Sequence, residues 1–141
     1  MIVFVMALAA VGLGDALYLV WVHATASKIA CPIGSCDVVN ASPYAAVWGF
    51  PVAGIGAIGY LGLLVLTAMA WRAEEEAERL RWLRWVFAGS LAGVLYASYL
   101  TYLELFVINA ICFWCVVSAI VITLICLASG LALRRPAPAR P

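Results

Sequence analysis

Four apolar blocks, each close to the length that crosses a lipid bilayer as a helix, constrain the fold of this chain more than any other feature. A membrane-spanning helix needs about 20 consecutive, predominantly apolar residues. The first block is interrupted only by Asp15, and the second and fourth contain no charged residue. The blocks cover residues 2–22, 47–71, 83–105 and 110–133.

The composition excludes a soluble bundle built from the same four helices. The chain is 67% hydrophobic and 11% charged, whereas a soluble domain carries about 25% charged residues. The first block lacks the basic start of a signal peptide and is too long for its apolar core, so we expect a retained span. The prediction is an all-α integral membrane four-helix bundle over residues 1–133, followed by a disordered cytoplasmic tail at 134–141.

The arginines and lysines predict the orientation of this bundle. In short loops, the side that carries more Lys and Arg faces the cytoplasm. The first connection carries only Lys28, and the third carries no basic residue. The second connection and the tail carry the other seven: Arg72, Arg79, Arg81, Arg84, Arg134, Arg135 and Arg140. We therefore expect both termini in the cytoplasm, and the first and third connections on the outer, oxidising side, where disulfides persist.

Four of the five cysteines belong to those two outer connections. Cys31 and Cys36 lie in the first as CPIGSC, and Cys112 and Cys115 open the fourth span as CFWC. Cys126 lies about 16 Å further along the same helix, at 1.5 Å per residue. We expect it to be an inert residue of the apolar core.

Three interpretations of the outer cysteines remain open from spacing alone. They are structural disulfides, a four-thiolate metal site of the kind zinc prefers, and a dithiol relay. The spacing favours the relay, because a Cys-x-x-Cys disulfide closes too small a ring to stabilise a fold. Cys112 also lies where the free N–H groups of a helix start favour the reactive thiolate. A dithiol at this boundary can meet a soluble thiol on one side and a lipid-soluble acceptor, a quinone, on the other.

The motifs as a set resemble those of the bacterial homologues of vitamin K epoxide reductase. The similarity extends over roughly residues 8–130 and combines four spans, a cysteine pair in the first outer loop and a CxxC at the fourth span. The matching stretches are GDALYLVW (14–21), CPIGSCDVVNASPYA (31–45), GFPVAGIGAIGY (49–60) and YLTYLELFVINAICFWC (99–115).

The resemblance implies a membrane thiol–disulfide oxidoreductase that supports disulfide formation in secreted proteins. A separate thioredoxin-like, DsbA-like protein would attack the disulfide of Cys31 and Cys36, with Cys31 as the point of attack. Cys36 would then attack Cys112, and Cys115 would be released beside a quinone, either menaquinone or ubiquinone. The expected location is the inner membrane of a bacterial cell, with the active site facing the periplasm or exterior. We predict no metal ligand, and the alternative is a non-catalytic membrane protein whose outer cysteines are structural disulfides or metal ligands.

Several further residues are candidates for supporting roles in this site. Ser42 matches a loop serine of the family, although a Ser-Pro turn would also explain it. Glu104, near the outer end of the third span, could support the site, pair with the loop or cap a helix. Asp15 is expected to point into the bundle, in a structural or a proton-handling role. Three aromatic residues could form the wall of a quinone pocket, or could lie at the membrane interface: Trp48, Phe50 and Trp114.

Overall fold

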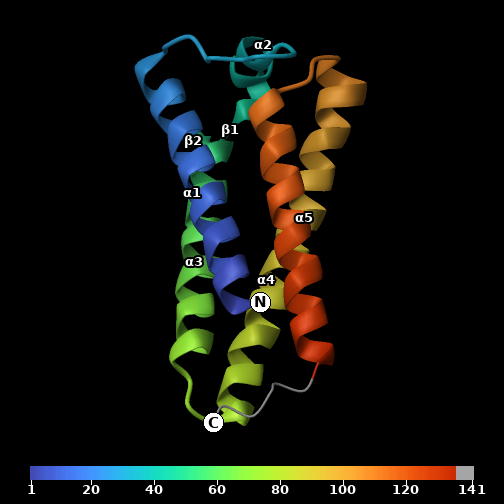
Figure 1. Cartoon of the computed structure of the whole chain (residues 1–141). Helices are drawn as coiled ribbons and strands as arrows, with labels where there is room; N and C mark the ends of the chain where they lie inside the picture. The colour runs from blue at the N-terminus through green and yellow to red at the C-terminus, as the bar shows by residue number, and fades with distance from the viewer. Residues whose placement is uncertain (136–141) are drawn as a thin grey trace.

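The computed structural model describes residues 1–135 and contains a bundle of four long helices (Figure 1). Each of the four is long and apolar enough to cross a membrane, which confirms the prediction of an all-α membrane bundle. The third of them is prolonged by a π-helical turn, η2. The helices are α1 (Ile2–Thr25), α3 (Val52–Arg72), α4 (Glu76–Tyr102) with η2 (Leu103–Ile108), and α5 (Phe113–Arg134).

The helices form a closed ring of neighbours. Helix α1 packs against α3 and α5, and α4 packs against the same two helices. Small residues let the helices approach closely. Gly12 faces the ring of Tyr60, and Gly93 faces Ile122 at a distance that leaves no room for a Cβ atom. Such contacts suit membrane helices, whose association depends on close packing of small residues.

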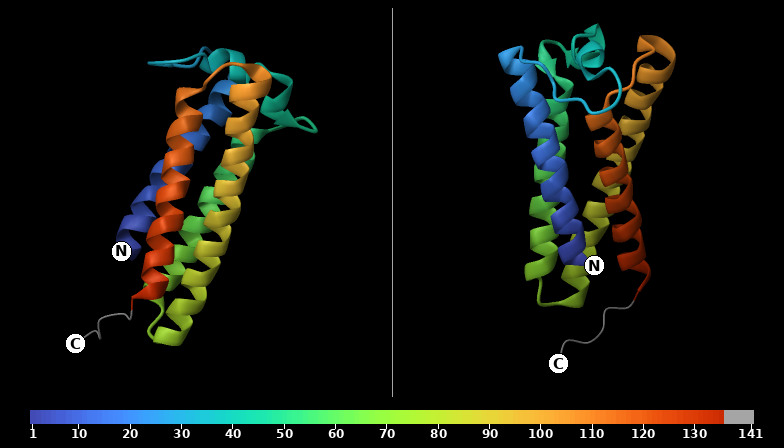
Figure 2. Two further views of the ribbon diagram at one scale, coloured as in Figure 1. Left: turned by 90° about the vertical axis from the view of Figure 1, so that its right-hand side faces the viewer. Right: turned by 45° about the horizontal axis from the view of Figure 1, so that its top comes forward.

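One end of the bundle, called the outer end after the predicted topology, is covered by the segment between α1 and α3. It contains the short helix α2 (Cys36–Asn40), the 3₁₀ turn η1 (Pro43–Ala45) and a small antiparallel hairpin of β1 (Ala46–Val47) and β2 (Phe50–Pro51). The turn between η2 and α5 reaches the same end, whereas the α3–α4 turn lies at the opposite end (Figures 1 and 2). The two cysteine-bearing segments are therefore on one side of the bundle.

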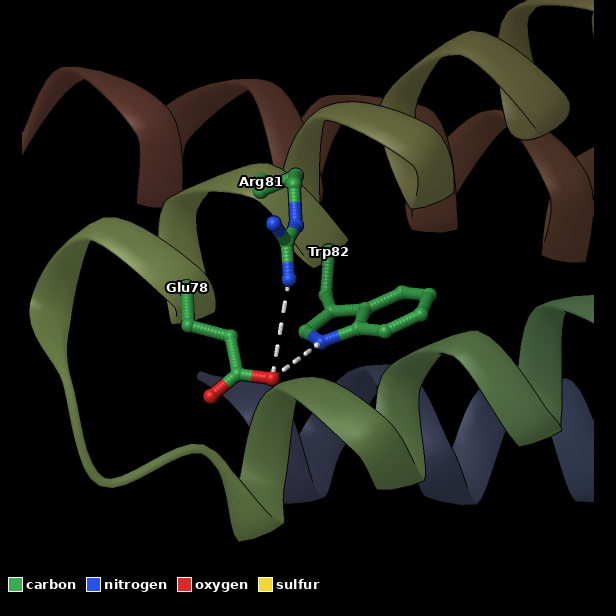
Figure 3. A network of polar contacts seen from close by, with 3 residues as sticks. All are labelled: Glu78, Arg81 and Trp82. Carbon is green, nitrogen blue, oxygen red and sulfur yellow. Dashed lines mark hydrogen bonds and ion pairs between the residues drawn. The ribbon is translucent and has the colours of Figure 1, made fainter.

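Two helix starts differ by five residues or more from the sequence-based spans, and α5 begins at Phe113, three residues later than predicted. Helix α3 begins at Val52 instead of residue 47, because the hairpin occupies the preceding residues. Helix α4 begins at Glu76 instead of residue 83, because acidic residues are favourable in the first turn of a helix. Glu78 stabilises this turn as it accepts a hydrogen bond from Nε1 of Trp82 at 3.3 Å and lies 3.7 Å from Nη2 of Arg81 (Figure 3).

The predicted tail lies almost entirely beyond what the structure describes. Helix α5 ends at Arg134, and Arg135 is the last described residue. The expectation of disorder at residues 136–141 falls outside the described residues. The division into a domain at 1–133 and a tail therefore stays a prediction.

Candidate active site

The four outer cysteines gather in one buried cluster at the outer end of the bundle. Cys31 and Cys36 form a disulfide, with their Cα atoms 6.0 Å apart. Cys112 is the residue immediately before α5, and Cys115 lies in its first turn; both are free thiols. Cys36 and Cys112 are only 1% and 2% exposed, and both belong to one apolar cluster that also contains Leu19. The partly buried Cys31 and Cys115 pack against this cluster. Two pairs that are about 75 residues apart in the sequence thus share one environment.

A backbone contact between the two segments holds the cysteine pairs together. Gly34 and Cys112 form an isolated antiparallel bridge, and the N–H of Ser35 donates to the carbonyl oxygen of Ile111 at 2.8 Å. Gly34 has a φ of +100°, and a Cβ atom there would lie 2.5 Å from the same carbonyl oxygen. Only glycine fits this position without displacing the contact.

Side chains from α1 and α5 hold the residue that precedes Cys31. The hydroxyl of Tyr18 accepts a hydrogen bond from the N–H of Ala30 at 3.1 Å, and Nε1 of Trp114 donates to the carbonyl oxygen of Ala30 at 2.8 Å. The rings of Tyr18 and Trp114 pack with their centroids 5.3 Å apart. Trp114, which the sequence offered either for the wall of a quinone pocket or for the membrane interface, therefore positions the chain next to the disulfide of Cys31 and Cys36.

The π-helical turn η2 places Glu104 beside Cys112 and Cys115, which we call the inner pair; Cys31 and Cys36 are the outer pair. Glu104 is 5% exposed, and its Oε2 accepts a hydrogen bond from the N–H of Cys112 at 3.1 Å. Its carboxyl group also interacts with the side chain of Cys115. The N–H of Ala110 donates to the backbone oxygen of Glu104 at 3.0 Å and closes the turn. Glu104 thus satisfies an N–H at the start of α5 that would otherwise be buried without a partner.

The contacts of Cys112 favour its thiolate form, so that its thiol has a lower pKa than that of an ordinary cysteine. A hydrogen bond from the Cys115 side chain lowers the pKa of the Cys112 thiol, and backbone hydrogen bonds from Cys115 and Trp114 act in the same direction. Burial and the nearby Glu104 carboxylate oppose this effect. A thiolate is the form that attacks disulfides, so the position at the start of α5 suits thiol–disulfide exchange.

An apolar cavity of about 460 Å³ opens between the helices next to the inner pair. Its size lies within the range of pockets that bind small organic molecules. Most of its lining is aliphatic, and it is contributed by all four long helices and by the segment that covers them. Its lining includes five of the residues singled out from the sequence: Asp15, Ser42, Glu104, Cys112 and Cys115.

Ser42 lies in the covering segment, where its hydroxyl donates to the carbonyl oxygen of Val39 at 2.7 Å. The local turn therefore uses the serine as a structural donor while the residue also borders the cavity. The three aromatic residues do not line it. Trp48 is fully exposed at the tip of the hairpin, and Phe50 is half exposed with its ring packed toward Gly54.

Sequence reasoning missed residues whose roles depend on contacts between distant parts of the chain. Gly34, Tyr18 and the pair of Tyr60 and Ser118 are the clearest cases. The hydroxyl of Tyr60 donates to the carbonyl oxygen of Ser118 at 2.9 Å, which links α3 to α5 below the inner cysteines. Both residues line the cavity. The glycine inside CPIGSC was the one available signal, because glycine often marks a close backbone approach.

The four apolar helices and the cysteine cluster define a multi-pass membrane protein with two cysteine pairs, one of them a disulfide, at one end of the bundle. The sequence model of the Vitamin K epoxide reductase family matches residues 3–129. The chain therefore belongs to this family and is an oxidoreductase. A comparison with curated proteins finds no match.

Proposed function

We propose that this protein oxidises a thioredoxin-like protein outside the cell membrane and passes the electrons through its two cysteine pairs to a membrane quinone. The observation that carries the proposal is the single buried cluster in which both pairs meet beside an apolar cavity. The outer pair is on the segment that covers the bundle, and the inner pair is at the start of α5. Net disulfide formation in secreted proteins would follow.

The first exchange takes place at Cys31. Cys36 is almost completely buried, whereas Cys31 is half buried, so a thiolate of the partner protein reaches the sulfur of Cys31 more easily. Attack there forms a bond between the partner and Cys31 and releases the Cys36 thiolate. The second thiol of the partner then displaces Cys31, which leaves the partner oxidised and the outer pair reduced.

The second exchange moves the electrons to the inner pair. Cys36 attacks Cys112 of an inner disulfide, so that a Cys36–Cys112 bond forms and Cys115 is released. Cys31 then attacks Cys36, which restores the outer disulfide and leaves two inner thiols. The described structure, with an outer disulfide and free Cys112 and Cys115, corresponds to the state after this transfer.

The third exchange regenerates the inner disulfide. Cys112 and Cys115 lose two electrons and two protons, and a quinone in the adjacent cavity takes up both. The cavity suits such a molecule because it is apolar, has a fitting volume and is bordered by Cys115. Glu104 is placed to accept the proton of Cys115, since the two side chains interact and border the same cavity.

The membrane orientation follows from the arginines. The described arginines lie on α3 and α4 near the α3–α4 turn, and at or directly after the C-terminal end of α5; both places are opposite the cysteine segments (Figure 1). By the positive-inside rule, that end faces the cytoplasm and the cysteines face the periplasm or exterior. A separate soluble partner can then reach the outer pair.

Quinone reduction by the purified protein in detergent tests the proposal. The assay is anaerobic, uses a reduced thioredoxin-like protein as donor, and follows the absorbance of short-chain menaquinone and ubiquinone analogues. We expect turnover in the wild type, none in Cys115→Ala or Cys112→Ala, and full turnover in Cys126→Ala, whose thiol lies outside the cavity lining. Full turnover without Cys115 would contradict the electron path. If the wild type also shows no turnover, and has a static disulfide count or stoichiometric zinc, structural or metal-binding cysteines are favoured.

A further inference from the structure

Asp15 is the one charged side chain of α1 and has no visible structural purpose. It is 8% exposed, it borders the cavity, and neither of its carboxyl oxygens has a hydrogen-bond partner among the described residues. A buried polar group without a partner is costly, and an ionisable residue inside a membrane span usually marks a functional site. We therefore expect the free carboxyl group to bind a molecule that enters the cavity.

The surroundings of Asp15 place it close to the depth of the inner cysteines. The ring of Tyr60 fills the space beside Gly12 on α1, and its hydroxyl contacts Ser118 on α5. Asp15 is three residues beyond Gly12 toward the outer end, and Cys115 is three residues before Ser118 in the same direction. Each step is about 4.5 Å along a helix axis. Asp15 and Cys115 therefore lie at similar depths on the neighbouring helices α1 and α5 and border the same cavity.

The charge of the lining determines which form of Asp15 is present. Among residues 1–135, those that border the cavity include Glu104 but no Lys, Arg or His, so this part of the chain offers no cation to pair with a carboxylate. An unpaired negative charge in this apolar setting is strongly disfavoured, and the neutral acid is retained. A neutral carboxylic acid has one O–H donor to offer.

We propose that Asp15, as a neutral acid, donates a hydrogen bond to a carbonyl oxygen of the quinone and thereby fixes its ring in the cavity beside Cys115. The inference deepens the proposed function and rests on it. Asp15 supplies no electrons: the two thiols of the inner pair supply both electrons and both protons. The hydrogen bond stabilises the negative charge that develops on the quinone oxygen as the electrons arrive.

A binding measurement without turnover tests this role. In a Cys115→Ala background, quenching of tryptophan fluorescence reports the affinity for 1,4-naphthoquinone. We expect Asp15→Leu to weaken binding about tenfold, the effect of losing one good hydrogen bond, and Asp15→Asn to stay within about threefold, because the amide still donates. With 2-methylnaphthalene, which has no carbonyl oxygen, wild type and Asp15→Leu should bind equally.

Stability separates this role from a structural one. Asp15→Leu removes an unpartnered polar group, so its melting temperature should equal or exceed that of the wild type. The matched control is Thr67→Val, which removes a buried hydroxyl of α3 that bonds to the carbonyl oxygen of Leu63 and does not border the cavity. This control should leave naphthoquinone affinity unchanged.

Two results would overturn the inference. One is equal naphthoquinone affinity in the wild type and Asp15→Leu. The other is an equal loss of affinity for both ligands, which would mean that leucine merely changes the shape of the cavity. Failure of the proposed function gives a different pattern: the quinone would bind through Asp15, yet the protein with all its cysteines would show no electron transfer from the partner.

Discussion

Replacing Gly34 by alanine should separate the two cysteine pairs without touching a sulfur atom. Gly34 lies between Cys31 and Cys36 and forms the bridge to Cys112. Its φ of +100° and the 2.5 Å approach of an added Cβ atom to the carbonyl oxygen of Ile111 make alanine incompatible with the docked segment. Either the segment that carries Gly34 or the turn before α5 must therefore move, which breaks the contact between them.

The structure sets the size of this effect. A residue with a Cβ atom in a left-handed conformation costs about 1–2 kcal/mol. The hydrogen bond from Ser35 to Ile111, at 2.8 Å, contributes about 1 kcal/mol when it is lost. The docked arrangement should therefore lose about 2–3 kcal/mol, which shifts the ratio of docked to undocked segments by about 30- to 150-fold.

A disulfide equilibrium measures this ratio directly. In a protein that carries Cys31→Ser and Cys115→Ser, Cys36 and Cys112 are left to pair with each other. Their disulfide is titrated in glutathione buffers of known composition, and alkylation followed by mass spectrometry identifies the bonded residues. Adding Gly34→Ala should lower the equilibrium constant of this disulfide by the same about 30- to 150-fold.

Gly49 provides the matched control. It also has a positive φ, of +80°, but no atom of the described residues lies within 4 Å of an added Cβ atom. Gly49→Ala should strain the hairpin and leave the Cys36–Cys112 equilibrium within about twofold, because the hairpin does not contact the turn before α5 through this residue. If Gly34→Ala behaves like this control, the bridge does not hold the cysteine pairs together and the reasoning is refuted.

Three further perturbations probe the contacts around the site. Glu104→Leu leaves the N–H of Cys112 buried without a partner, so the free energy of unfolding should fall by about 1–3 kcal/mol and the melting temperature should drop. Glu104→Gln should lose less, because its amide oxygen still accepts. An unchanged melting temperature in both variants would exclude a capping role for Glu104. Trp114→Phe removes the donor to the carbonyl oxygen of Ala30 and should speed reduction of the outer disulfide by dithiothreitol about fivefold, and an unaltered rate would count against this clamp. Cys115→Ala removes the hydrogen bond that lowers the pKa of Cys112, so thiolate absorbance at 240 nm should appear at higher pH than in the wild type, and a midpoint that stays or falls would contradict the assignment.

The spans were predictable because hydropathy over about 20 residues needs no knowledge of tertiary contacts. The ends were less predictable, since they depend on local partners. Helix α4 begins within the acidic run because Glu78 pairs with Arg81 and accepts a hydrogen bond from Trp82, both about one turn later. Helix α3 begins late because residues 46–51 pair with each other. Both shifts arise from interactions that an apolar window does not register.

The candidate site was predictable as a set of cysteines but not as a geometry. Spacing and topology placed Cys31, Cys36, Cys112 and Cys115 on one side of the membrane. The bridge at Gly34 joins segments about 75 residues apart, and no local pattern encodes such a contact. The aromatic residues illustrate the same limit, because whether a side chain faces a cavity or solvent is set by turns whose dihedral angles depend on the folded surroundings.

In the proposed relay, the burial of the inner pair explains why two cysteine pairs would be used where one dithiol could reduce a quinone. Cys112 is 2% exposed and lies under the segment that carries the outer disulfide. A soluble thiol that approaches from water therefore meets Cys31 before it can reach the inner sulfur atoms. Burial also keeps the cavity apolar, which suits a lipid-soluble acceptor and keeps water away from the charge that develops on it. In this proposed mechanism the loop pair gives a large protein partner access to the site, and the helix pair keeps the final transfer in an apolar environment. The bridge between Gly34 and Cys112 makes the two conditions compatible, because it holds the accessible pair against the buried one.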